Sequence, residues 1–428
     1  MKIGIISLGC AKNQVDTEQM LSLFKKEGWE ITNRSEEAEV LVVNTCGFIS
    51  SAKEESIDAI LEMAEYKKTG RCRVLCVTGC LAQRYREELF QEIPEIDCLL
   101  GVYSYGNVVD AIRRALQGER VNEKREDRGF LECGRVLTTP FYSAYVRIGE
   151  GCNNRCAYCA IPLIRGDHRS RPRESILTEM RMLAAGGARE QILISQDTSV
   201  WGREMGDELG GLMEAACLID GLDWLRVLYM YPDEIDLKLL ERMAKQKKIC
   251  RYLDLPLQHA SETLLKSMNR RGSMESTRRL LHAAREMGFT LRTTFIVGFP
   301  GETEADFEQL MDFTSEIGFD RMGAFTFSPE EDTKAFDLPG QVPEEVKQER
   351  LDRLMTLQAG ISLSRNRARV GTEEKVLVCE GLTGRSEAEA PDADGVIRLV
   401  SRDTLEPGTF VTARITQADT YDLTAEVL

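Results

Sequence analysis

The sequence predicts an α/β protein of three parts: a parallel α/β amino-terminal domain, a partial TIM-like (β/α)6 barrel, and a small all-β carboxy-terminal domain of oligonucleotide-fold type. Apolar runs of strand length alternate with helical patterns over residues 1–342, which is typical of parallel sheets. Residues 370–428 instead carry short β runs between Gly and Pro-Gly turns. The length of 428 residues agrees, because one hydrophobic core rarely covers so long a chain.

The amino-terminal domain is expected at residues 1–118. Its strands are predicted at Ile3–Ile6, Val40–Val43 and Val74–Val77, and its helices at Asp16–Lys26, Ala52–Lys67, Leu81–Gln91 and Asn107–Leu116. Cys10, Cys46 and Cys80 each follow the carboxyl end of one of these strands. Because ligands of open α/β sheets gather at that edge, we expect the three cysteines to converge on one site.

Residues 119–139 predict a linker, since they are rich in charge and poor in apolar side chains. The charged residues are Glu119, Arg120, Glu123, Lys124, Arg125, Glu126, Asp127 and Arg128. The partial barrel is expected at 140–342. Its six strands are predicted at Tyr142–Ile148, Gln191–Ser195, Leu225–Tyr229, Tyr252–Leu255, Leu291–Val297 and Gly323–Phe327.

A charged helix at 343–369 leads to the third domain at 370–428. Its strands are predicted at Val376–Cys379, Val396–Val400, Thr409–Ile415 and Tyr421–Val427.

Composition favours a cytoplasmic, reduced protein. Hydrophobic residues make up 43% of the chain. No stretch approaches the ~18 uninterrupted apolar residues of a membrane span, and Met1–Ser7 reads as a strand rather than a leader. The thirteen cysteines are an odd number, which favours thiols and metal ligands over disulfides.

The most informative motif is Gly151-Cys-Asn-Asn-Arg-Cys-Ala-Tyr-Cys-Ala160, a C-x3-C-x2-C loop formed by Cys152, Cys156 and Cys159. Iron–sulfur cubanes normally take four thiolates, so three predict one iron left open for a small molecule. Zinc is the alternative and would need a fourth ligand, for which His168 is the nearest candidate. Incidental reduced cysteines are the other alternative. The remaining cysteines are expected to pack as small apolar residues: Cys72, Cys76, Cys98, Cys133, Cys217, Cys250 and Cys379.

This loop, with Tyr158 before its last cysteine, resembles the cluster loop of radical S-adenosylmethionine (SAM) enzymes. Ser7-Leu-Gly-Cys-Ala-Lys-Asn13, Asn44-Thr-Cys-Gly-Phe-Ile49 and Thr78-Gly-Cys-Leu-Ala-Gln83 resemble the three cysteine segments of the methylthiotransferase amino-terminal domain. Together the three segments are far more specific than any one alone.

The resemblance implies a radical-SAM barrel, a carboxy-terminal TRAM domain that binds substrate, and two 4Fe–4S clusters. Cys152, Cys156 and Cys159 would hold the cluster at which SAM is cleaved to a 5′-deoxyadenosyl radical. Cys10, Cys46 and Cys80 would hold a second cluster that carries the sulfur. SAM would act both as radical source and as methyl donor, and the electron would come from a partner such as flavodoxin or ferredoxin.

Residues after the barrel strands resemble the SAM-binding edges of the family, and Tyr158 is counted with them. These residues are Gln196, Asp197, Gln258, Gly298 and Glu302. Amide and carboxylate groups can hold the methionine ammonium and ribose hydroxyls, and glycine lets the backbone approach adenine. For Gln196, Asp197 and Gln258 the alternative is a structural role in the loop, and His259 would cap or orient its loop.

Other polar residues near the cysteines have two interpretations. Arg165, Arg169, Arg171 and Arg173 would offset the charge of the cluster and carboxylate, or form a solvated basic strip. Lys12 and Asn13 are candidate substrate contacts, with turn formation as the alternative.

Charge helps to select the substrate. Residues 370–428 carry five basic and twelve acidic side chains, a net charge of −7, whereas a nucleic-acid-binding domain should be basic. An acidic domain attracts a basic protein, although a merely solubilising surface is the alternative. The segments Ser7–Asn13, Tyr229–Asp233 and Glu389–Gly395 resemble the branch that places a methylthio group on the β-carbon of an aspartate of small-subunit ribosomal protein S-twelve. That protein, free or on the ribosome, is the expected partner.

Two other functions stay open. A transfer-RNA adenosine methylthiotransferase would share both clusters, and a non-catalytic electron carrier would not cleave SAM. We expect no sequence-specific DNA binding and no membrane partner.

Overall fold

The computed structural model describes residues 1–125 and 129–428 and divides into two compact units. The first comprises Met1–Thr139, Glu150–Asn153 and Cys159–Arg171, and the second comprises Pro140–Gly149, Asn154–Tyr158 and Pro172–Leu428. The loop with the C-x3-C-x2-C motif therefore contributes residues to both units.

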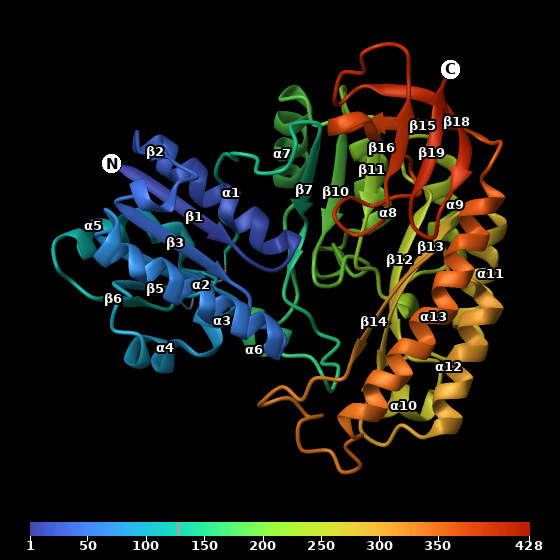
Figure 1. Ribbon diagram of the computed structural model, residues 1–428, viewed down its shortest axis with the longest axis horizontal. Coiled ribbons are helices and arrows are strands. Elements are labelled where there is room, and N and C mark those ends of the chain that lie inside the picture. The colour runs from blue at the N-terminus through green and yellow to red at the C-terminus, as the bar shows by residue number, and fades with distance from the viewer. Residues whose placement is uncertain (126–128) are drawn as a thin grey trace. The chain divides into compact units, whose positions relative to one another are not determined.

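The first unit is built on a six-stranded parallel sheet in the order β2-β1-β3-β4-β5-β6 (Figure 1). The strands are β1 Lys2–Ser7, β2 Glu30–Ile31, β3 Val40–Thr45, β4 Val74–Gly79, β5 Cys98–Leu100 and β6 Val121–Glu123. Side chains of β3 and β4 are buried throughout, as expected for central strands covered by helices on both faces.

Helices cover both faces of this sheet. They are α1 Ala11–Lys26, α2 Ser50–Thr69, α3 Cys80–Arg84, α4 Arg86–Glu92 and α5 Val108–Leu116, with 3-10 turns at Ser35–Glu37 and Tyr105–Asn107. Helix α6, Ile161–Arg165, packs against α3. Phe24 of α1 and Ile112 of α5 belong to one core, and Ile60 of α2 and Leu89 of α4 to the other. The sheet thus separates two apolar cores.

Three local features differ from the prediction. Helix α1 begins at Ala11, immediately after Cys10, instead of at Asp16. The helix expected at Leu81–Gln91 is two helices, because Tyr85 leaves helical geometry with φ −112° and ψ 36°. Strands β2, β5 and β6 are too short for their pattern to be visible in the sequence.

The expected linker at 119–139 packs on the first unit. Val121 pairs with Cys98, so β6 closes the sheet edge. Leu131 and Val136 pack against a core, and the buried Arg135 forms an ion pair with the buried Glu18. Glu126, Asp127 and Arg128 of the expected linker lie outside the described residues.

The second unit begins with six parallel strands in two hydrogen-bonded sheets, β11-β10-β7 and β12-β13-β14. The strands are β7 Ser143–Arg147, β10 Glu190–Ile194, β11 Trp224–Val227, β12 Tyr252–Gln258, β13 Thr290–Val297 and β14 Arg321–Thr326. The bridge from Leu225 to Ile249 lies where the two sheets meet. This is the predicted partial barrel, and all six strands occur where the sequence places them. Two further short strands, β8 Gly149–Glu150 and β9 Arg169–Ser170, form a separate two-stranded sheet.

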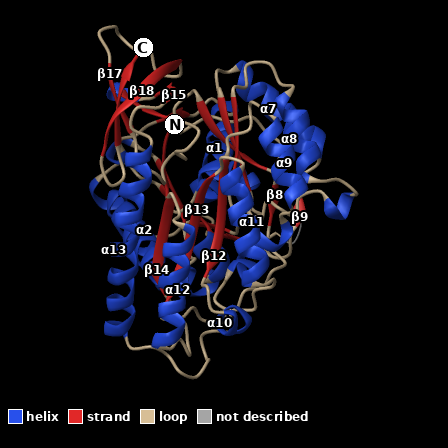
Figure 2. Cartoon of the chain, turned by 90° about the vertical axis from the view of Figure 1, so that its right-hand side faces the viewer, coloured by secondary structure: helices blue, strands red, loops and turns tan. Residues whose placement is uncertain are grey.

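Helices alternate with these strands. They are α7 Arg173–Ala185, α8 Leu209–Cys217, α9 Leu237–Lys245, α10 Glu262–Ser267, α11 Met274–Glu286 and α12 Glu304–Ile317, with 3-10 turns at Arg203–Met205 and Pro232–Glu234. The long helix α13, Glu344–Ala368, lies alongside β14 and α12 (Figure 2). None of the helices in the described parts of the chain is long and apolar enough to cross a membrane.

The chain ends in a closed five-stranded barrel in the order β15-β16-β17-β19-β18. The strands are β15 Glu373–Val378, β16 Thr383–Arg385, β17 Ile397–Val400, β18 Phe410–Ala418 and β19 Leu423–Val427, with a 3-10 turn at Glu380–Leu382. Strand β16 was not predicted, because three residues give no pattern. The predicted α/β fold class, with its parallel sheet, partial barrel and small β barrel, is confirmed.

Buried charges join the small barrel to the partial barrel within the second unit. Glu190, at the start of β10, is fully buried between Arg226 of β11 and Arg385 of β16, with ion pairs of 3.1 and 2.6 Å. Burial alone would raise the pKa of Glu190, but Arg385 and Arg226 together lower it to about 2. The carboxylate is therefore ionised and compensated inside the protein.

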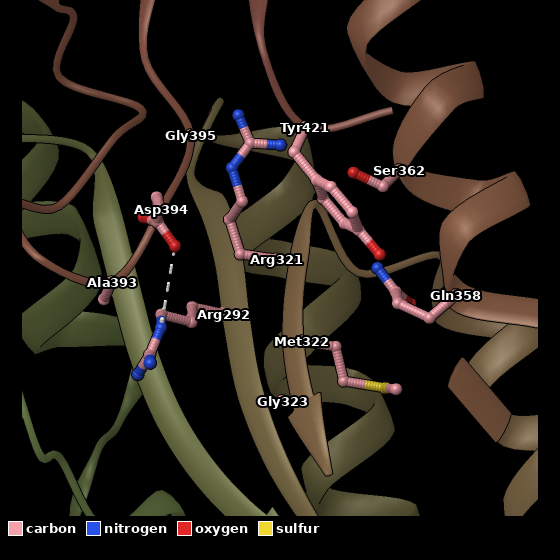
Figure 3. Close-up of a pocket in the computed structure, with 10 residues that line it drawn as sticks. All are labelled: Arg292, Arg321, Met322, Gly323, Gln358, Ser362, Ala393, Asp394, Gly395 and Tyr421. Carbon is pink, nitrogen blue, oxygen red and sulfur yellow. Dashed lines mark ion pairs between the residues drawn. The ribbon is translucent and has the colours of Figure 1, made fainter. Parts of the chain in front are cut away.

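The acidic stretch Glu389–Gly395 reaches the same end of the partial barrel. Glu389 pairs with Arg321 at 3.0 Å, and Asp394 accepts a hydrogen bond of 2.6 Å from the Tyr252 hydroxyl. A cavity of about 310 Å³ lies beside it, near the amino-terminal ends of β13 and β14 (Figure 3). This cavity therefore lies at the end of the partial barrel opposite the carboxyl ends of its strands.

Candidate active site

The first unit brings Cys10, Cys46 and Cys80 to one edge of its sheet. Cys10 follows β1 and precedes α1, Cys46 follows β3, and Cys80 follows β4 as the first residue of α3. A Cβ on Gly9 would lie 3.1 Å from the Cys46 sulfur, and a Cβ on Gly47 would lie 3.1 Å from the carbonyl carbon of Cys80. The two glycines thus let the three cysteine loops approach closely, as the strand-edge rule predicts.

Asn13 ties these loops together. Its Nδ2 donates hydrogen bonds of 2.9 Å to the carbonyls of Leu8 and Thr45, which lead to Cys10 and Cys46. Its Oδ1 lies 3.7 Å from the Cys80 sulfur, which donates to it. The Asn13 side chain is only 1% exposed, and its hydrogen bonds hold the loops of Cys10 and Cys46 beside Cys80. Lys12 is buried as well.

Arg165, the last residue of α6, reaches the same place. Its Nη2 donates to the Cys80 sulfur at 3.6 Å and to Asn13 Oδ1 at 2.9 Å. Asp16 and Glu150 pair with it at 3.1 Å each, and the side chain is 1% exposed. Two carboxylates thus compensate a buried cation beside one thiol.

Burial shifts two of these three thiols, Cys46 and Cys80, toward the protonated form. Burial raises the pKa of Cys80 to about 12, although Arg165 opposes this, and burial also raises the pKa of Cys46. The other two cysteines raise the pKa of Cys80 further, because a second thiolate nearby is repulsive. Metal binding at these thiols would therefore release protons.

The loop Gly151–Ala160 follows β7 and β8, at the carboxyl end of the first barrel strand. Gly151 has φ +77°, and a Cβ there would lie 2.2 Å from the Asp167 carbonyl, so only glycine fits. The amide of Cys152 donates to the Gly166 carbonyl at 3.1 Å. Within the second unit, the Ala157 amide donates to the Met268 carbonyl at 2.9 Å. The loop backbone is thus fixed on both sides of Cys156.

Arg270 contacts two residues of this loop. Its Nη1 lies 3.9 Å from the Cys156 sulfur and 3.4 Å from the Tyr158 hydroxyl, and its Nη2 donates to the Pro256 carbonyl at 2.7 Å. Its guanidinium stacks 4.3 Å from the centre of the Tyr231 ring. Arg270 could not be recognised from the sequence, because its partners come from separate barrel segments.

Asp197 contacts the same loop. Its Oδ2 accepts a hydrogen bond of 2.7 Å from Asn154, and its Oδ1 accepts one of 3.1 Å from the Ser199 amide. Gln196 precedes it in the bend after β10. Asp197 is therefore well placed to orient the loop, while Asn154 was not identified from the sequence.

Gln258 ends β12 with an unusual backbone. Its φ is +74°, and the pairing with β13 shifts register between Leu255 and Gln258. Arg155 and Tyr229, which also follow barrel strands, have positive φ values of 48° and 61°. Positive φ values are uncommon for non-glycine residues, so Gln258 is a distinctive feature of the turn after β12.

Gly298 and Glu302 serve their own loop. The Gly298 amide donates to Glu302 Oε2 at 2.8 Å, and Arg350 pairs with Glu302 Oε1 at 2.8 Å. Glu302 is buried, and His259 Nε2 lies 3.5 Å from its Oε2. His259 Nδ1 accepts from the Ser261 amide at 2.9 Å, which agrees with the expected role of His259 in orienting its loop. The Glu302 carboxylate is thus engaged by the protein on both oxygens.

The four arginines after the loop do not act as one strip. Arg165 contacts Cys80 of the amino-terminal set, Arg171 pairs with Glu132 at 2.7 Å, and Arg173 pairs with Asp207. Arg169 stacks on the Tyr103 ring at 5.1 Å. Of the four, only Arg165 contacts a cysteine sulfur of the amino-terminal set, and Arg270, which was not predicted, lies near the Cys156 sulfur.

Among residues 1–125 and 129–428, no three His, Cys, Asp or Glu side chains form a group that could hold one metal ion. In a cubane each cysteine binds a different iron, so its ligands need not converge on one point. Of the cysteines expected to pack, Cys72, Cys76, Cys98, Cys217 and Cys250 are buried, while Cys133 and Cys379 are half-buried.

Comparison with known proteins divides the chain into three segments. Residues 2–101 match a family described as "Uncharacterized protein family UPF0004", 146–314 match the radical SAM superfamily, and 370–428 match the TRAM domain.

Curated relatives match the whole chain. A protein of Desulforudis audaxviator named "Ribosomal protein uS12 methylthiotransferase RimO" is 50% identical over 438 residues, covering 100% of this chain and 97% of its own length. Proteins with the same name from Pelotomaculum thermopropionicum and Clostridioides difficile are 50% and 46% identical, covering 100% of this chain and 99% of their own lengths.

Solved structures share the fold. The radical SAM methyltransferase TsrM of Kitasatospora setae superposes with a TM-score of 0.58 at 15% identity, covering 78% of this chain and 76% of its own. The cobalamin-dependent SAM radical enzyme OxsB gives a TM-score of 0.51 at 14% identity, covering 84% of this chain and 56% of its own.

Proposed function

Since the chain belongs to the RimO family of ribosomal protein uS12 methylthiotransferases, we propose that it transfers a methylthio group to ribosomal protein uS12, on the β-carbon of an aspartate. It is a radical SAM transferase, as the resemblance in its sequence implies. An unactivated C–H bond requires radical chemistry, which a cofactor supplies while the protein binds and orients.

We propose two 4Fe–4S clusters, one held by Cys152, Cys156 and Cys159 and the other by Cys10, Cys46 and Cys80. The observation that carries the second is the meeting of three cysteines from distant loops at one sheet edge, with a buried arginine on Cys80. When bound, a reduced cluster with SAM supplies the 5′-deoxyadenosyl radical. Each set offers three thiolates, which leaves one iron open for a small molecule.

The chain's own residues would hold the cofactors as follows. Arg270 would donate N–H groups toward Cys156 and Tyr158 and keep water from that side of the loop, since its ring partner Tyr231 is buried. Asp197 and Asn154 would fix the loop, and Gln196 and Gln258 would offer amides to the methionine and ribose groups of SAM. Gly298 and Glu302 would shape the neighbouring turn.

We further propose that the protein works in the cytoplasm, receives electrons from a flavodoxin or ferredoxin, and meets uS12 either free or on the ribosome. The net negative charge of residues 370–428 supports a basic protein as the substrate over an RNA.

The test is anaerobic incubation of the reconstituted protein with SAM, a reductant and either uS12 or transfer RNA, followed by mass spectrometry of both. We expect a mass gain equal to methylthio for hydrogen on one aspartate of uS12. The same gain on an adenosine of the RNA, with unmodified uS12, would overturn the proposed substrate.

Two variants test the division of labour between the cysteine sets. Cys10→Ala should abolish methylthio transfer yet leave formation of 5′-deoxyadenosine, because the radical-generating loop is intact. Cys156→Ala should abolish both. Equal loss of 5′-deoxyadenosine in the two variants would contradict the assignment.

A further inference from the structure

We propose that Arg165 is a positioning residue that couples the two cysteine sites: it holds Cys80 beside its iron and anchors the segment that follows Cys159 at the amino-terminal site. This inference rests on the proposed function, in which Cys80 and Cys159 are ligands of different clusters. Arg165 itself touches neither substrate nor SAM in the proposal.

Contacts of the amino-terminal site converge at the Arg165 guanidinium. Nη2 donates to Asn13 Oδ1 at 2.9 Å and to the Cys80 sulfur at 3.6 Å. Because Asn13 also binds the loops before Cys10 and Cys46, Arg165 is connected to all three cysteine loops through a single amide. A displacement of Arg165 would therefore disturb the whole set.

Arg165 lies six residues after Cys159, the last cysteine of the C-x3-C-x2-C loop. The stretch Cys159–Arg171 packs as part of the first unit, and it starts with the last cysteine of the C-x3-C-x2-C loop. Ala160 and Ile164 lie with Cys80 in one buried apolar cluster. Helix α6 thus runs from the loop cysteine directly to the arginine on Cys80, and a short helix transmits position better than a flexible loop does.

The charge of Arg165 is balanced by two carboxylates. Asp16 and Glu150 hold the guanidinium in a buried position, each at 3.1 Å, so its N–H group stays directed at the sulfur. Hydrogen bonds to ligand sulfurs are one of the factors that set the reduction potential of a cluster, because they favour the more negative, reduced state. A purely structural arginine would affect stability without this electrochemical effect.

The experiment isolates the second cluster in a full-length chain that carries Cys152→Ala, Cys156→Ala and Cys159→Ala. Into this background we would introduce Arg165→Gln, Arg165→Lys and, as a matched control, Arg171→Gln. Arg171 is also a buried arginine of the same segment, but its ion pair is with Glu132 at 2.7 Å. Iron content and redox titration followed by electron paramagnetic resonance are the readouts.

We expect Arg165→Gln to lower the reduced-to-oxidised ratio at the parent's midpoint by at least about tenfold, which corresponds to about 59 mV for one electron. Arg165→Lys keeps the cation and should lower the ratio by less than about threefold. Arg171→Gln should leave the ratio unchanged.

In the chain with all six ligand cysteines, the readout is the amount of methylthio product per 5′-deoxyadenosine. Arg165→Gln should lower it by at least about tenfold and Arg165→Lys, which lacks the planar fork, by at least about threefold. If Arg165→Gln does not fold, Arg165→Lys decides alone, and an unchanged product ratio in it would overturn the inference.

The proposed second cluster and the proposed role of Arg165 can be refuted separately. A parent without iron in the triple-alanine background would overturn the proposed second cluster, and the inference with it. A parent that binds iron, with an unshifted midpoint and product ratio in Arg165→Gln, would overturn the role of Arg165 alone.

Discussion

Glu190 provides a quantitative test of how the small β barrel is held to the partial barrel. Its side chain is fully buried and compensated by Arg226 and Arg385. The lowering of its pKa from the ordinary 4.5 to about 2 corresponds to about 3 kcal/mol of folding free energy, at about 1.4 kcal/mol for each tenfold change in proton affinity. Glu190→Gln keeps the shape but leaves two arginines uncompensated, so we expect a loss of about 3–5 kcal/mol.

The assay is anaerobic urea unfolding at pH 7, followed by tryptophan fluorescence. Trp224 is the reporter, because its ring lies 4.7 Å from the ring of Phe410 in the small barrel. The matched control is Glu308→Gln, which removes the exposed ion pair with Arg353 and should cost less than about 1 kcal/mol. A loss in Glu190→Gln no larger than in this control would refute the reasoning.

The same variant has a defined pH dependence. A carboxyl group whose pKa is lowered by folding stabilises the protein fully above its ordinary pKa of 4.5, and this stabilisation is lost as the pH falls toward about 2. The difference in unfolding free energy between the parent and Glu190→Gln should thus be constant from pH 7 to 5 and shrink below pH 4.5. A difference that grows on acidification would contradict the assigned ion pairs.

Two further changes test the amino-terminal site. Gly79 and Gly118 share a positive φ of +99° and +93°, but a Cβ on Gly79 would lie 2.4 Å from the Thr45 carbonyl and one on Gly118 would meet nothing within 4 Å. In thermal unfolding, Gly79→Ala should therefore cost more than about 4 kcal/mol and Gly118→Ala only about 1 kcal/mol, and equal losses would contradict the steric argument. Asn13→Ala should lower the free energy of unfolding by about 1–3 kcal/mol for each carbonyl it leaves unpaired. In the triple-alanine background it should also lower the iron content. Full retention of iron would contradict the positioning role of Asn13.

The location of the amino-terminal site could be predicted because it follows from topology. Carboxyl ends of parallel strands share one edge, so Cys10, Cys46 and Cys80 meet although they are far apart in sequence. All six strands of the partial barrel could also be predicted, because their apolar runs are long enough to recognise.

The contacts that could not be predicted are those that a single residue makes with a partner far away in the sequence. Arg270 lies in a charged stretch that looks like solvated surface, and only the fold shows that it is buried near a cysteine sulfur. Arg165 was a candidate for charge compensation, but its contact with Cys80 of a distant loop is visible only in the fold. Strand β6 could not be predicted either, because an edge strand of three residues among charged neighbours shows no recognisable alternation of apolar and polar residues. It forms because its backbone pairs with β5, the neighbouring strand of the sheet.

The acidic side chains of residues 370–428 do not all lie at the surface. Their net charge of −7 supports a basic protein as partner, but part of it faces inward. Glu389 lies between Arg321 and Arg369, and the largely buried side chain of Asp394 accepts a hydrogen bond from Tyr252. These acids stabilise the joint with the partial barrel, so they attract no substrate. Substrate preference must therefore rest on the acids that remain at the surface.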